Sequence, residues 1–292
     1  MIWHNIAHRI GEVTGTQFTI VKHATVSGGC INEAWRLDGA DGRRFFVKLN
    51  HADNEEMFAA EAAGLREILD AEAVAVPAPV CFGRAEKHAF LVLEYLSFGG
   101  GDVSVKLGQG LALMHHHTAA DYGWQRDNTI GSTPQINAPN SDWIAFWGEQ
   151  RLGYQLRLAQ QNGYGGELQR KGEQLLQRFP ALFSGYVPLP SLLHGDLWSG
   201  NQAVTESGEP VIFDPAVYYG DREADIAMTE LFGGFSSRFY AAYNEAWPLD
   251  DGYPLRRDLY NLYHILNHLN LFGGGYLQQA EQMMERLLSE LR

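Results

Sequence analysis

Alternating apolar and polar residues mark the first third of the chain as strand-rich. The period of two predicts two strands within residues 17–39, on either side of a Gly-Gly pair, and a third over residues 43–50. Residues 76–96 predict an extended segment followed by two more strands, and residues 4–13 a short amphipathic helix. We therefore expect a small β-sheet in this part of the chain.

A helical spacing interrupts the alternation over residues 52–72. Apolar residues recur there three or four positions apart, and Asp53 or Asn54 can cap the first turn. After residue 104 this spacing dominates, and strand-like segments are short, around Leu192 and over residues 210–215. The helices expected there cover residues 104–119, 141–161, 166–179, 256–274 and 277–292.

A glycine-rich stretch separates the two parts. Residues 97–104 read Ser-Phe-Gly-Gly-Gly-Asp-Val-Ser, and three consecutive glycines favour a linker over a helix or a strand. We expect an α+β protein with a small N-terminal lobe, residues 1–96, in which one helix packs on a β-sheet. Residues 97–292 are expected to form a larger, mainly helical C-terminal lobe.

The acidic composition excludes several kinds of partner. The formal net charge is −13 at pH 7, whereas nucleic acids and anionic membranes bind basic surfaces. The apolar runs are too short to cross a bilayer, and the first residues do not resemble a signal peptide. Two cysteines, Cys30 and Cys81, suggest neither a disulfide framework nor a zinc site. We expect a cytoplasmic protein without nucleic-acid or membrane partners, as a monomer, with a homodimer left open.

One short segment has the residues that phosphoryl transfer requires. His194, Asp196, Leu197 and Asn201 follow the spacing H-x-D-L-x-x-x-N of a kinase catalytic loop. In such a loop the aspartate orients the accepting hydroxyl and the asparagine binds Mg²⁺. Asp214 follows an apolar run, where a second metal-binding carboxylate is expected, and Mg²⁺ prefers these oxygen ligands. The spacing predicts Asp196 as catalytic, and Asn201 and Asp214 as ligands of the Mg²⁺ that accompanies ATP.

The strand over residues 43–50 offers the lysine that such a site needs. Period two places Lys48 on the same face as the aromatic Phe46. In the following helix, Glu61 lies on the apolar side, where a carboxylate needs a cationic partner. A strand lysine paired with a helix glutamate orients the α- and β-phosphates in kinases. We predict this pairing; a solvated lysine is the alternative.

Two further segments are predicted to contact the nucleotide. Residues 27–30 form the tip between the first two strands and could cover the phosphates, although they match neither a full G-x-G-x-x-G nor a Walker A motif. Residues 94–96 resemble a hinge whose backbone binds adenine. Cys30 would lie beside the nucleotide, which suggests redox sensitivity as a hypothesis, whereas Cys81 is interpreted as structural. The residues expected to bind ATP are Ser27, Gly28, Gly29, Cys30, Lys48, Glu61, Glu94, Tyr95 and Leu96.

Departures from a protein kinase indicate a small acceptor. Gly195 replaces the arginine that clamps a phosphorylated activation loop, Asp214 is followed by Pro-Ala, and no Ala-Pro-Glu segment follows. The chain therefore has no obvious phosphorylation switch or peptide platform. We expect the acceptor near Trp198, whose indole can stack on a sugar or contact a cation. The alternative for this residue is a tryptophan of the core.

These residues resemble the fructosamine kinase (ketosamine-3-kinase) family, a branch of the aminoglycoside and choline kinase-like group. The distinctive segment is HGDLWSGN, and the likeness covers nearly the whole chain. It implies a protein-kinase-like bilobal fold, with residues 1–96 binding the nucleotide and residues 97–292 carrying the catalytic loop and the acceptor site. It also implies ATP-dependent phosphorylation of the 3-hydroxyl of a ketosamine, small or protein-bound. Deglycation follows because the 3-phosphate makes the adduct decompose.

The resemblance also implies roles for single residues. Asp196 matches the catalytic aspartate of the family, and Trp198 a position near the sugar. Asp225 matches a structural aspartate that supports the catalytic loop, and His115 matches a histidine of a family helix. The role of residues 131–135 is left open. The positions that match the ion pair and the magnesium ligands are Lys48, Glu61, Asn201 and Asp214.

Two other functions stay open at this point. The acceptor could be an aminoglycoside or choline, because the sequence does not identify the residues of the acceptor pocket; Trp198 favours a ketosamine. A non-catalytic nucleotide-binding protein would be expected to lack Lys48, Asp196, Asn201 or Asp214, and all four are present. Neither the sugar nor the amine of the acceptor is identified.

Overall fold

The computed structural model describes residues 2–26 and 31–291, which form two compact units. The first unit comprises the chain up to Val103 together with Gln202–Pro215, and the second comprises Ser104–Asn201 and the chain from Ala216 onward. The first unit thus takes in the glycine-rich stretch and a later segment, beyond the boundary expected at Leu96.

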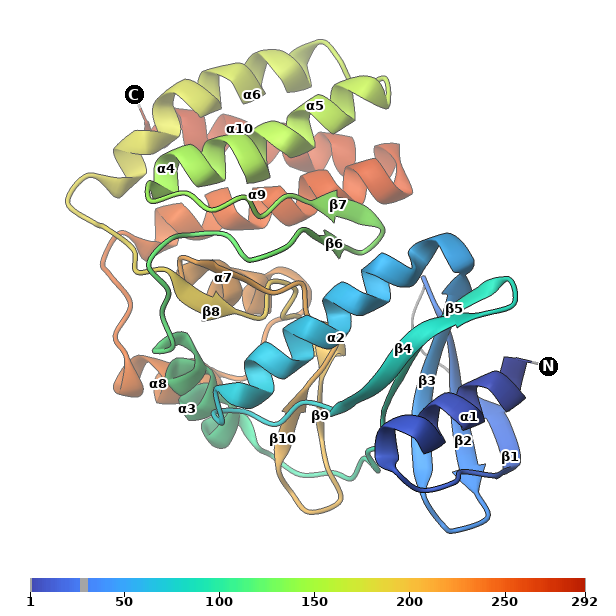
Figure 1. Ribbon diagram of the computed structural model, residues 1–292. Helices are drawn as coiled ribbons and strands as arrows, with labels where there is room; N and C mark the ends of the chain where they lie inside the picture. Colours follow the sequence, from blue (N-terminus) through green and yellow to red (C-terminus); the bar gives the residue numbers. More distant parts are fainter. Residues whose placement is uncertain (1, 27–30, 292) are drawn as a thin grey trace. The chain divides into compact units, whose positions relative to one another are not determined.

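The first unit contains a five-stranded antiparallel sheet with the order β1-β2-β3-β5-β4 (Figure 1). The alternation in the sequence reflects its two differently covered faces. In β3, Lys48 lies between Ala34 of β2 and Leu91 of β5. The strands are β1 (Ile20–Thr25), β2 (Glu33–Gly39), β3 (Arg44–His51), β4 (Pro79–Ala85) and β5 (His88–Glu94).

Two helices pack on this sheet. The helix α1 (Ile2–Thr14) contributes Ile6 and Ile10 to a core that also contains Val47. The helix α2 (Glu55–Asp70) follows a short 3-10 helix, η1 (Ala52–Asn54), and contacts β4 and β5. Asn54 occupies the N-cap position of α2 as expected, but its side chain makes no capping hydrogen bond; its amide nitrogen donates to Asn50 Oδ1 at 2.9 Å.

A hairpin from later in the chain completes the first unit. It consists of β9 (Gln202–Val204) and β10 (Pro210–Ile212), and β10 bridges in parallel to Ala75 through Val211. The Phe213 ring stacks on Phe98 with the ring centroids 5.9 Å apart. These contacts fix the end of β10, where Asp214 follows.

The second unit is mainly helical, and with the sheet of the first it gives the expected α+β class. Figure 1 shows α5, α6, α9 and α10 side by side. Its α-helices are α3 (Ser104–His115), α4 (Trp143–Phe146), α5 (Gly153–Gln161), α6 (Glu167–Arg178), α7 (Glu223–Leu231), α8 (Ser237–Ala246), α9 (Tyr253–Phe272) and α10 (Leu277–Glu290). Its other elements are the strands β6 (Asn128–Ile130), β7 (Thr133–Gln135), β8 (Ser191–Leu193) and β11 (Tyr218–Gly220), the π-helix η2 (Trp147–Leu152), and the 3-10 helices η3 (Phe179–Phe183), η4 (Ser199–Asn201) and η5 (Gly274–Tyr276).

Two helices, α7 and α8, are additional to those expected from the sequence. In α7 the residues from Glu223 to Thr229 are all buried, so the apolar residues follow no one-sided spacing. The predicted helix over residues 141–161 is present as α4, η2 and α5 in succession. Its π turn brings the carbonyl oxygen of Gly148 so close to Gly153 that a Cβ there would lie 2.4 Å away.

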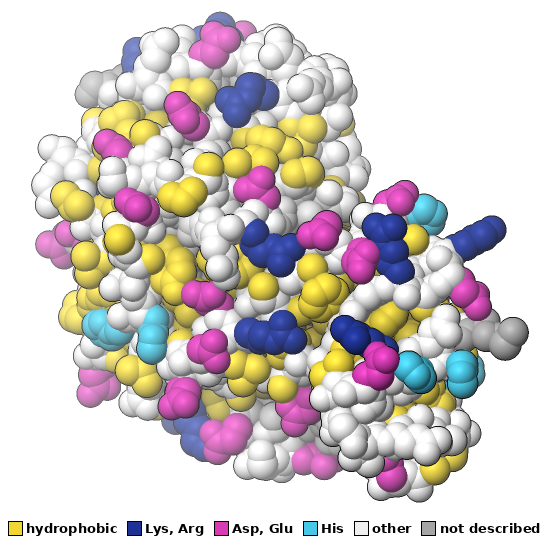
Figure 2. Space-filling view, in the orientation of Figure 1, with side chains coloured by type: hydrophobic (Ala, Val, Ile, Leu, Met, Phe, Trp, Pro, Cys, Tyr) yellow, Lys and Arg dark blue, Asp and Glu magenta, His cyan; other side chains and the backbone are white. Residues whose placement is uncertain are grey.

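The face of the molecule shown in Figure 2 carries no wide basic patch. Figure 2 shows Lys and Arg side chains interspersed with Asp and Glu. Within residues 2–26 and 31–291, no helix combines the length and apolar character needed to cross a bilayer.

Candidate active site

Three ionisable side chains of the first unit meet at the Lys48 ammonium group; we call them the lysine cluster. Lys48 Nζ donates to Glu61 Oε1 at 2.5 Å and to Asp214 Oδ1 at 2.6 Å. The side chains of Lys48 and Glu61 are 8% and 12% exposed, whereas that of Asp214 is 44% exposed. The structure therefore contains the ion pair expected between β3 and α2, and it adds Asp214 to the pair.

The electrostatics of the lysine cluster keep Lys48 charged. Burial alone would lower the pKa of Lys48, but the charges of Asp214 and Glu61 outweigh burial and raise it above its ordinary value. Burial raises the pKa of Glu61, against the opposing effect of Lys48. The ammonium group is thus a fixed positive charge at neutral pH.

The backbone of Asp214 is in the left-handed region, with a φ of 58°. Aspartate is one of the few non-glycine residues that occupy this region readily, and such conformations recur at functional sites. The turn after β10 directs one carboxylate oxygen, Oδ1, to Lys48. The other oxygen has no hydrogen-bond partner among the residues described, so the partly exposed carboxylate can bind another ligand.

The predicted catalytic loop follows β8 in the second unit. The strand β11 pairs with β8 in antiparallel register, Tyr218 opposite Leu193. Beyond the pair, the Ala216 amide donates to the carbonyl oxygen of His194 at 2.8 Å. Gly195 follows with a φ of +80°, and a Cβ on it would lie 2.1 Å from the carbonyl oxygen of Ala216. The replacement of the kinase arginine by glycine therefore has a steric reason.

Gly195→Ala is expected to lower the free energy of unfolding by about 2–5 kcal/mol, since left-handed strain and overpacking add. Gly208→Ala is the matched control, because Gly208 has a φ of +78° with no atom within 4 Å of its added Cβ. The control should lose only about 1–2 kcal/mol, the strain alone. Urea unfolding of both variants measures the difference, and equal losses would show that the contact with Ala216 is unimportant.

Asp196 and Asn201 are held together within the loop. The Asn201 amide nitrogen donates to the carbonyl oxygen of Asp196 at 2.9 Å and to its Oδ2 at 3.3 Å. Asn201 is 6% exposed, and its backbone amide donates to the Trp198 carbonyl oxygen at 2.9 Å. Because its amide nitrogen is taken up by Asp196, the amide oxygen of Asn201 is left for another partner.

Asp225, at the start of α7, holds the backbone just before Asp196. Its Oδ2 accepts from the His194 amide at 2.7 Å and its Oδ1 from the Gly195 amide at 2.8 Å. Burial alone would raise the pKa of Asp225, but hydrogen bonds from His115 and from the Gly195 backbone lower it. The carboxylate is therefore charged at neutral pH, as a support for the loop requires.

Trp198 is 38% exposed, which removes its interpretation as a core residue. Its indole lies against Gly200, where a Cβ would come within 2.2 Å of the ring. Phe232 meets the indole edge-on, with the centroids 6.4 Å apart. The aromatic surface continues from Phe232 to His268 at 4.9 Å and from there to Phe272 at 5.4 Å, and the Phe272 side chain is 58% exposed. Nothing in the sequence spacing indicated this extension.

The segment whose role the sequence left open belongs to the hairpin of β6 and β7. Gln135 is 1% exposed; its amide nitrogen donates to the Ala216 carbonyl oxygen at 3.0 Å, and its Oε1 accepts from the Tyr263 hydroxyl at 2.8 Å. Asn128 donates to the Val217 carbonyl oxygen at 2.8 Å. The hairpin therefore supports the backbone of residues 216–217.

The remaining predictions concern parts of the chain other than the lysine cluster and the catalytic loop. Residues 27–30, with the redox hypothesis for Cys30, are outside the described residues. Glu94 is the last residue of β5 and residues 95–96 follow the strand; the Glu94 amide donates to the Ala78 carbonyl oxygen at 2.8 Å. His116 stacks on Trp247 at 3.9 Å. Across residues 2–26 and 31–291, no group of three or more His, Cys, Asp and Glu could hold a metal ion by itself.

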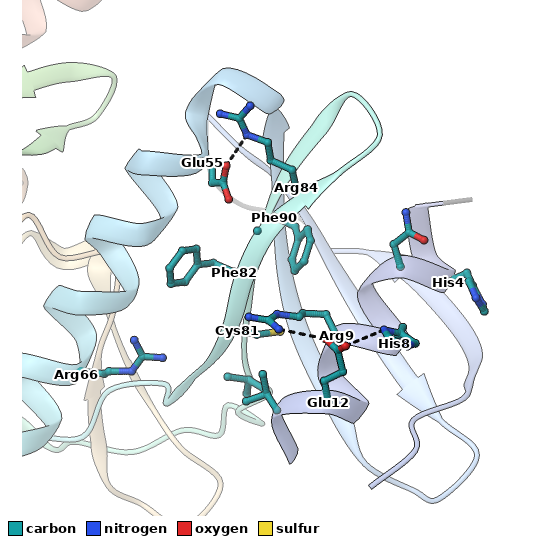
Figure 3. A pocket seen from close by; sticks show the side chains of 14 residues that line it. His4, His8, Arg9, Glu12, Glu55, Arg66, Cys81, Phe82, Arg84 and Phe90 are labelled. Carbon is teal, nitrogen blue, oxygen red and sulfur yellow. Dashed lines mark hydrogen bonds and ion pairs between the residues drawn. The ribbon is translucent and has the colours of Figure 1, made fainter. Parts of the chain in front are cut away.

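A hollow of about 730 Å³ also opens in the first unit (Figure 3). Residues of α1, α2, β4 and β5 line it, and none of the lysine cluster does. Figure 3 shows Arg84 paired with Glu55, and Glu12 paired with Arg9 and His8. Because the lining includes none of Lys48, Glu61 and Asp214, we assign the hollow no part in the site.

Comparison with known proteins shows what this chain resembles. The profile of the family described as fructosamine kinase matches residues 2–290. A Synechocystis protein named probable ketoamine kinase is 49% identical over 290 residues, covering 98% of this chain and 97% of its own. The chloroplastic protein-ribulosamine 3-kinase of Arabidopsis thaliana is 45% identical over 282 residues, covering 95% and 86%.

Solved structures of other proteins have the same fold as this chain. A candidate fructosamine-3-kinase from Haemophilus somnus superimposes with a TM-score of 0.90 at 29% identity, over 98% of both chains. An ADP-bound aminoglycoside phosphotransferase, at a TM-score of 0.64 and 12% identity over 95% and 96% of the chains, shares the fold alone. A match along almost the whole sequence, with relatives above 40% identity, shows that the chain belongs to the fructosamine kinase family and has its protein-kinase-like α+β fold.

Proposed function

We propose that the protein transfers the γ-phosphoryl group of ATP to the 3-hydroxyl of a ketosamine and thereby starts deglycation. The names of its relatives, ketoamine kinase and protein-ribulosamine 3-kinase, support the acceptor class. The observation that carries the chemistry is the catalytic loop, in which Asn201 holds Asp196 and Asp225 holds the preceding backbone. The proposed setting is the cytoplasm, with a monomer acting on small or protein-bound ketosamines.

The lysine cluster is proposed to bind the phosphates of ATP. Lys48 carries a charge that neighbouring carboxylates hold in place, so it can contact the α- and β-phosphates without reorganising. Residues 27–30 are proposed to cover the phosphates, and the backbone of residues 94–96 to bind adenine.

Magnesium suits two side-chain oxygen atoms that have no hydrogen-bond partner among the described residues. Asp214 has one carboxylate oxygen unpaired among the described residues, and the amide oxygen of Asn201 is turned from the bond to Asp196. Hard oxygen ligands of this kind suit Mg²⁺. When bound, the ion would neutralise the triphosphate charge; Asp214 and Asn201 would hold it.

Asp196 is proposed to orient the acceptor. Its carboxylate accepts a hydrogen bond from the 3-hydroxyl and receives the proton as that oxygen bonds to phosphorus. The bond between the γ-phosphorus and the bridging oxygen breaks, and ADP leaves. Such transfers depend mainly on alignment and on stabilisation of charge, and a loop fixed by Asp225 and Asn201 provides alignment.

Trp198→Ala is expected to raise KM for the ketosamine by roughly tenfold, because the exposed indole offers the face on which a sugar or a protonated amine can bind. KM for ATP should stay within about twofold. Trp198→Phe keeps an aromatic ring and should recover most of the loss. Steady-state kinetics with each substrate varied separately measure both values. An unchanged KM for the ketosamine in Trp198→Ala would remove the indole from the acceptor site.

The proposed function is tested by measuring the ADP formed from Mg-ATP in the presence of one acceptor at a time. The acceptors are a ribulosamine, a fructosamine, kanamycin and choline, and the Asp196→Asn variant is the blank. Turnover of a ketosamine that the blank lacks is the expected result, and the ratio of the two ketosamines identifies the sugar. Turnover of kanamycin or choline alone would keep the phosphotransferase chemistry and overturn the acceptor. ATP binding without turnover of any acceptor would contradict the proposal as a whole.

A further inference from the structure

A buried chain of hydrogen bonds runs through the second unit to the support of the catalytic loop. Arg222 Nη1 donates to the Tyr243 hydroxyl at 3.0 Å, and that hydroxyl lies 2.8 Å from His115 Nδ1. His115 Nε2 lies 3.2 Å from Asp225 Oδ2. The four side chains come from α3, α7 with its preceding residue, and α8, and each is at most 6% exposed. They form one connected network away from solvent.

The donor and the acceptor of each hydrogen bond in this network can be assigned. Burial lowers the pKa of His115, so the imidazole is neutral at pH 7 and carries one proton. The Asp225 carboxylate can only accept, which places that proton on Nε2. Nδ1 is then an acceptor, and it takes the hydrogen of Tyr243, whose hydroxyl is protonated because burial raises its pKa. Arg222 completes the order by donating to the Tyr243 oxygen.

His115 and the catalytic loop share the same carboxylate. Oδ2 of Asp225 faces both His115 Nε2 and the His194 amide, while Oδ1 accepts from Gly195. A carboxylate with donors on two sides cannot rotate without losing one of them. Loss of the donor at His115 would remove one of the three hydrogen bonds that fix Asp225 and would loosen the backbone directly before Asp196.

We propose that His115 is a positioning residue for phosphoryl transfer: as a hydrogen-bond donor ordered by Tyr243 and Arg222, it fixes the orientation of Asp225 and through it Asp196. This rests on the proposed function. We expect a change at His115 to alter kcat and not substrate binding. The network contacts the backbone of the catalytic loop, and none of its hydrogen bonds involves the lysine cluster or Trp198.

Two substitutions separate the two nitrogens of His115. The amide of His115→Gln reaches the position of Nε2 and can still donate to Asp225, whereas that of His115→Asn reaches only the position of Nδ1, near Tyr243. His115→Asn is expected to lower kcat by about 10- to 100-fold with both KM values within twofold, and His115→Gln by less than about threefold. The neighbouring His116→Asn, on an exposed ring stacked on Trp247, is the control and should keep its kcat.

Amide hydrogen exchange of residues 191–198 gives a second readout that needs no turnover. Exchange at the His194 and Gly195 amides should quicken in His115→Asn, less so in Tyr243→Phe, and stay unchanged in His115→Gln. Equal kcat and equal exchange in His115→Asn and His115→Gln would overturn the proposal. If His115→Asn does not fold, Tyr243→Phe decides, and exchange like that of the wild type overturns it. A wild-type protein inactive on every ketosamine refutes only the proposed function, since the exchange comparison still stands.

Discussion

Asp196→Asn should lower kcat for ketosamine phosphorylation by roughly a thousandfold or more, because the group that orients the hydroxyl and takes its proton is lost. The fold should survive. Asn201 donates to the backbone oxygen of residue 196 as well as to the carboxylate, and Asp225 holds the preceding amides, so the loop keeps most of its hydrogen bonds. The asparagine side chain has nearly the same shape and size as the aspartate that it replaces.

The measurement is kcat with saturating Mg-ATP and ketosamine, together with the melting temperature and the Kd for ATP by calorimetry. Asp251→Asn, at an exposed position of the second unit, removes one carboxylate elsewhere and should match the wild type in all three. A melting temperature within a few degrees and a lost kcat are expected together for Asp196→Asn. A kcat reduced by less than tenfold would exclude Asp196 as the residue that orients the acceptor.

Features encoded within one loop or two consecutive elements could be predicted from the sequence. Period two in β3 and helical spacing in α2 placed Lys48 and Glu61 on buried sides, where opposite charges had to pair. The spacing of Asp196 and Asn201 within a single loop was enough to bring their side chains together. In both cases the relevant geometry is set by a short stretch of backbone.

Features that depend on distant parts of the chain could not be predicted in this way. Asp214 reaches Lys48 from 166 positions away, and His115 reaches Asp225 from 110. No periodicity relates such positions, because tertiary packing alone brings them together. The helix α7 was missed for a related reason: it is buried on every side, so its sequence lacks the polar face that marks a surface helix.

Lys48→Met is expected to reduce kcat/KM for ATP by roughly 10²- to 10³-fold, since it removes a positive charge aimed at the phosphates. The same change leaves Glu61 buried and facing Asp214 without a cation, so the free energy of unfolding should fall by about 3–5 kcal/mol. Lys22→Met is the control, because Lys22 is an exposed lysine of β1, and it should change neither quantity. Adding Glu61→Gln to Lys48→Met should restore part of the stability but none of the activity, which separates the two effects.

The pH dependence of Lys48 provides a further check. The pKa of Lys48 is raised above its ordinary value of about 10.4, so the stability from its pairing is complete below that pH and is lost only as pH rises through the raised pKa. The ratio of wild-type to Lys48→Met activity should therefore be constant between pH 6 and pH 9, measured as kcat/KM for ATP across that range. A ratio that falls toward one within this window would mean that Lys48 loses its proton there, contrary to the charge that two adjacent carboxylates impose. A constant, large ratio would support a permanently charged lysine that is positioned by Glu61 and Asp214 to bind phosphate.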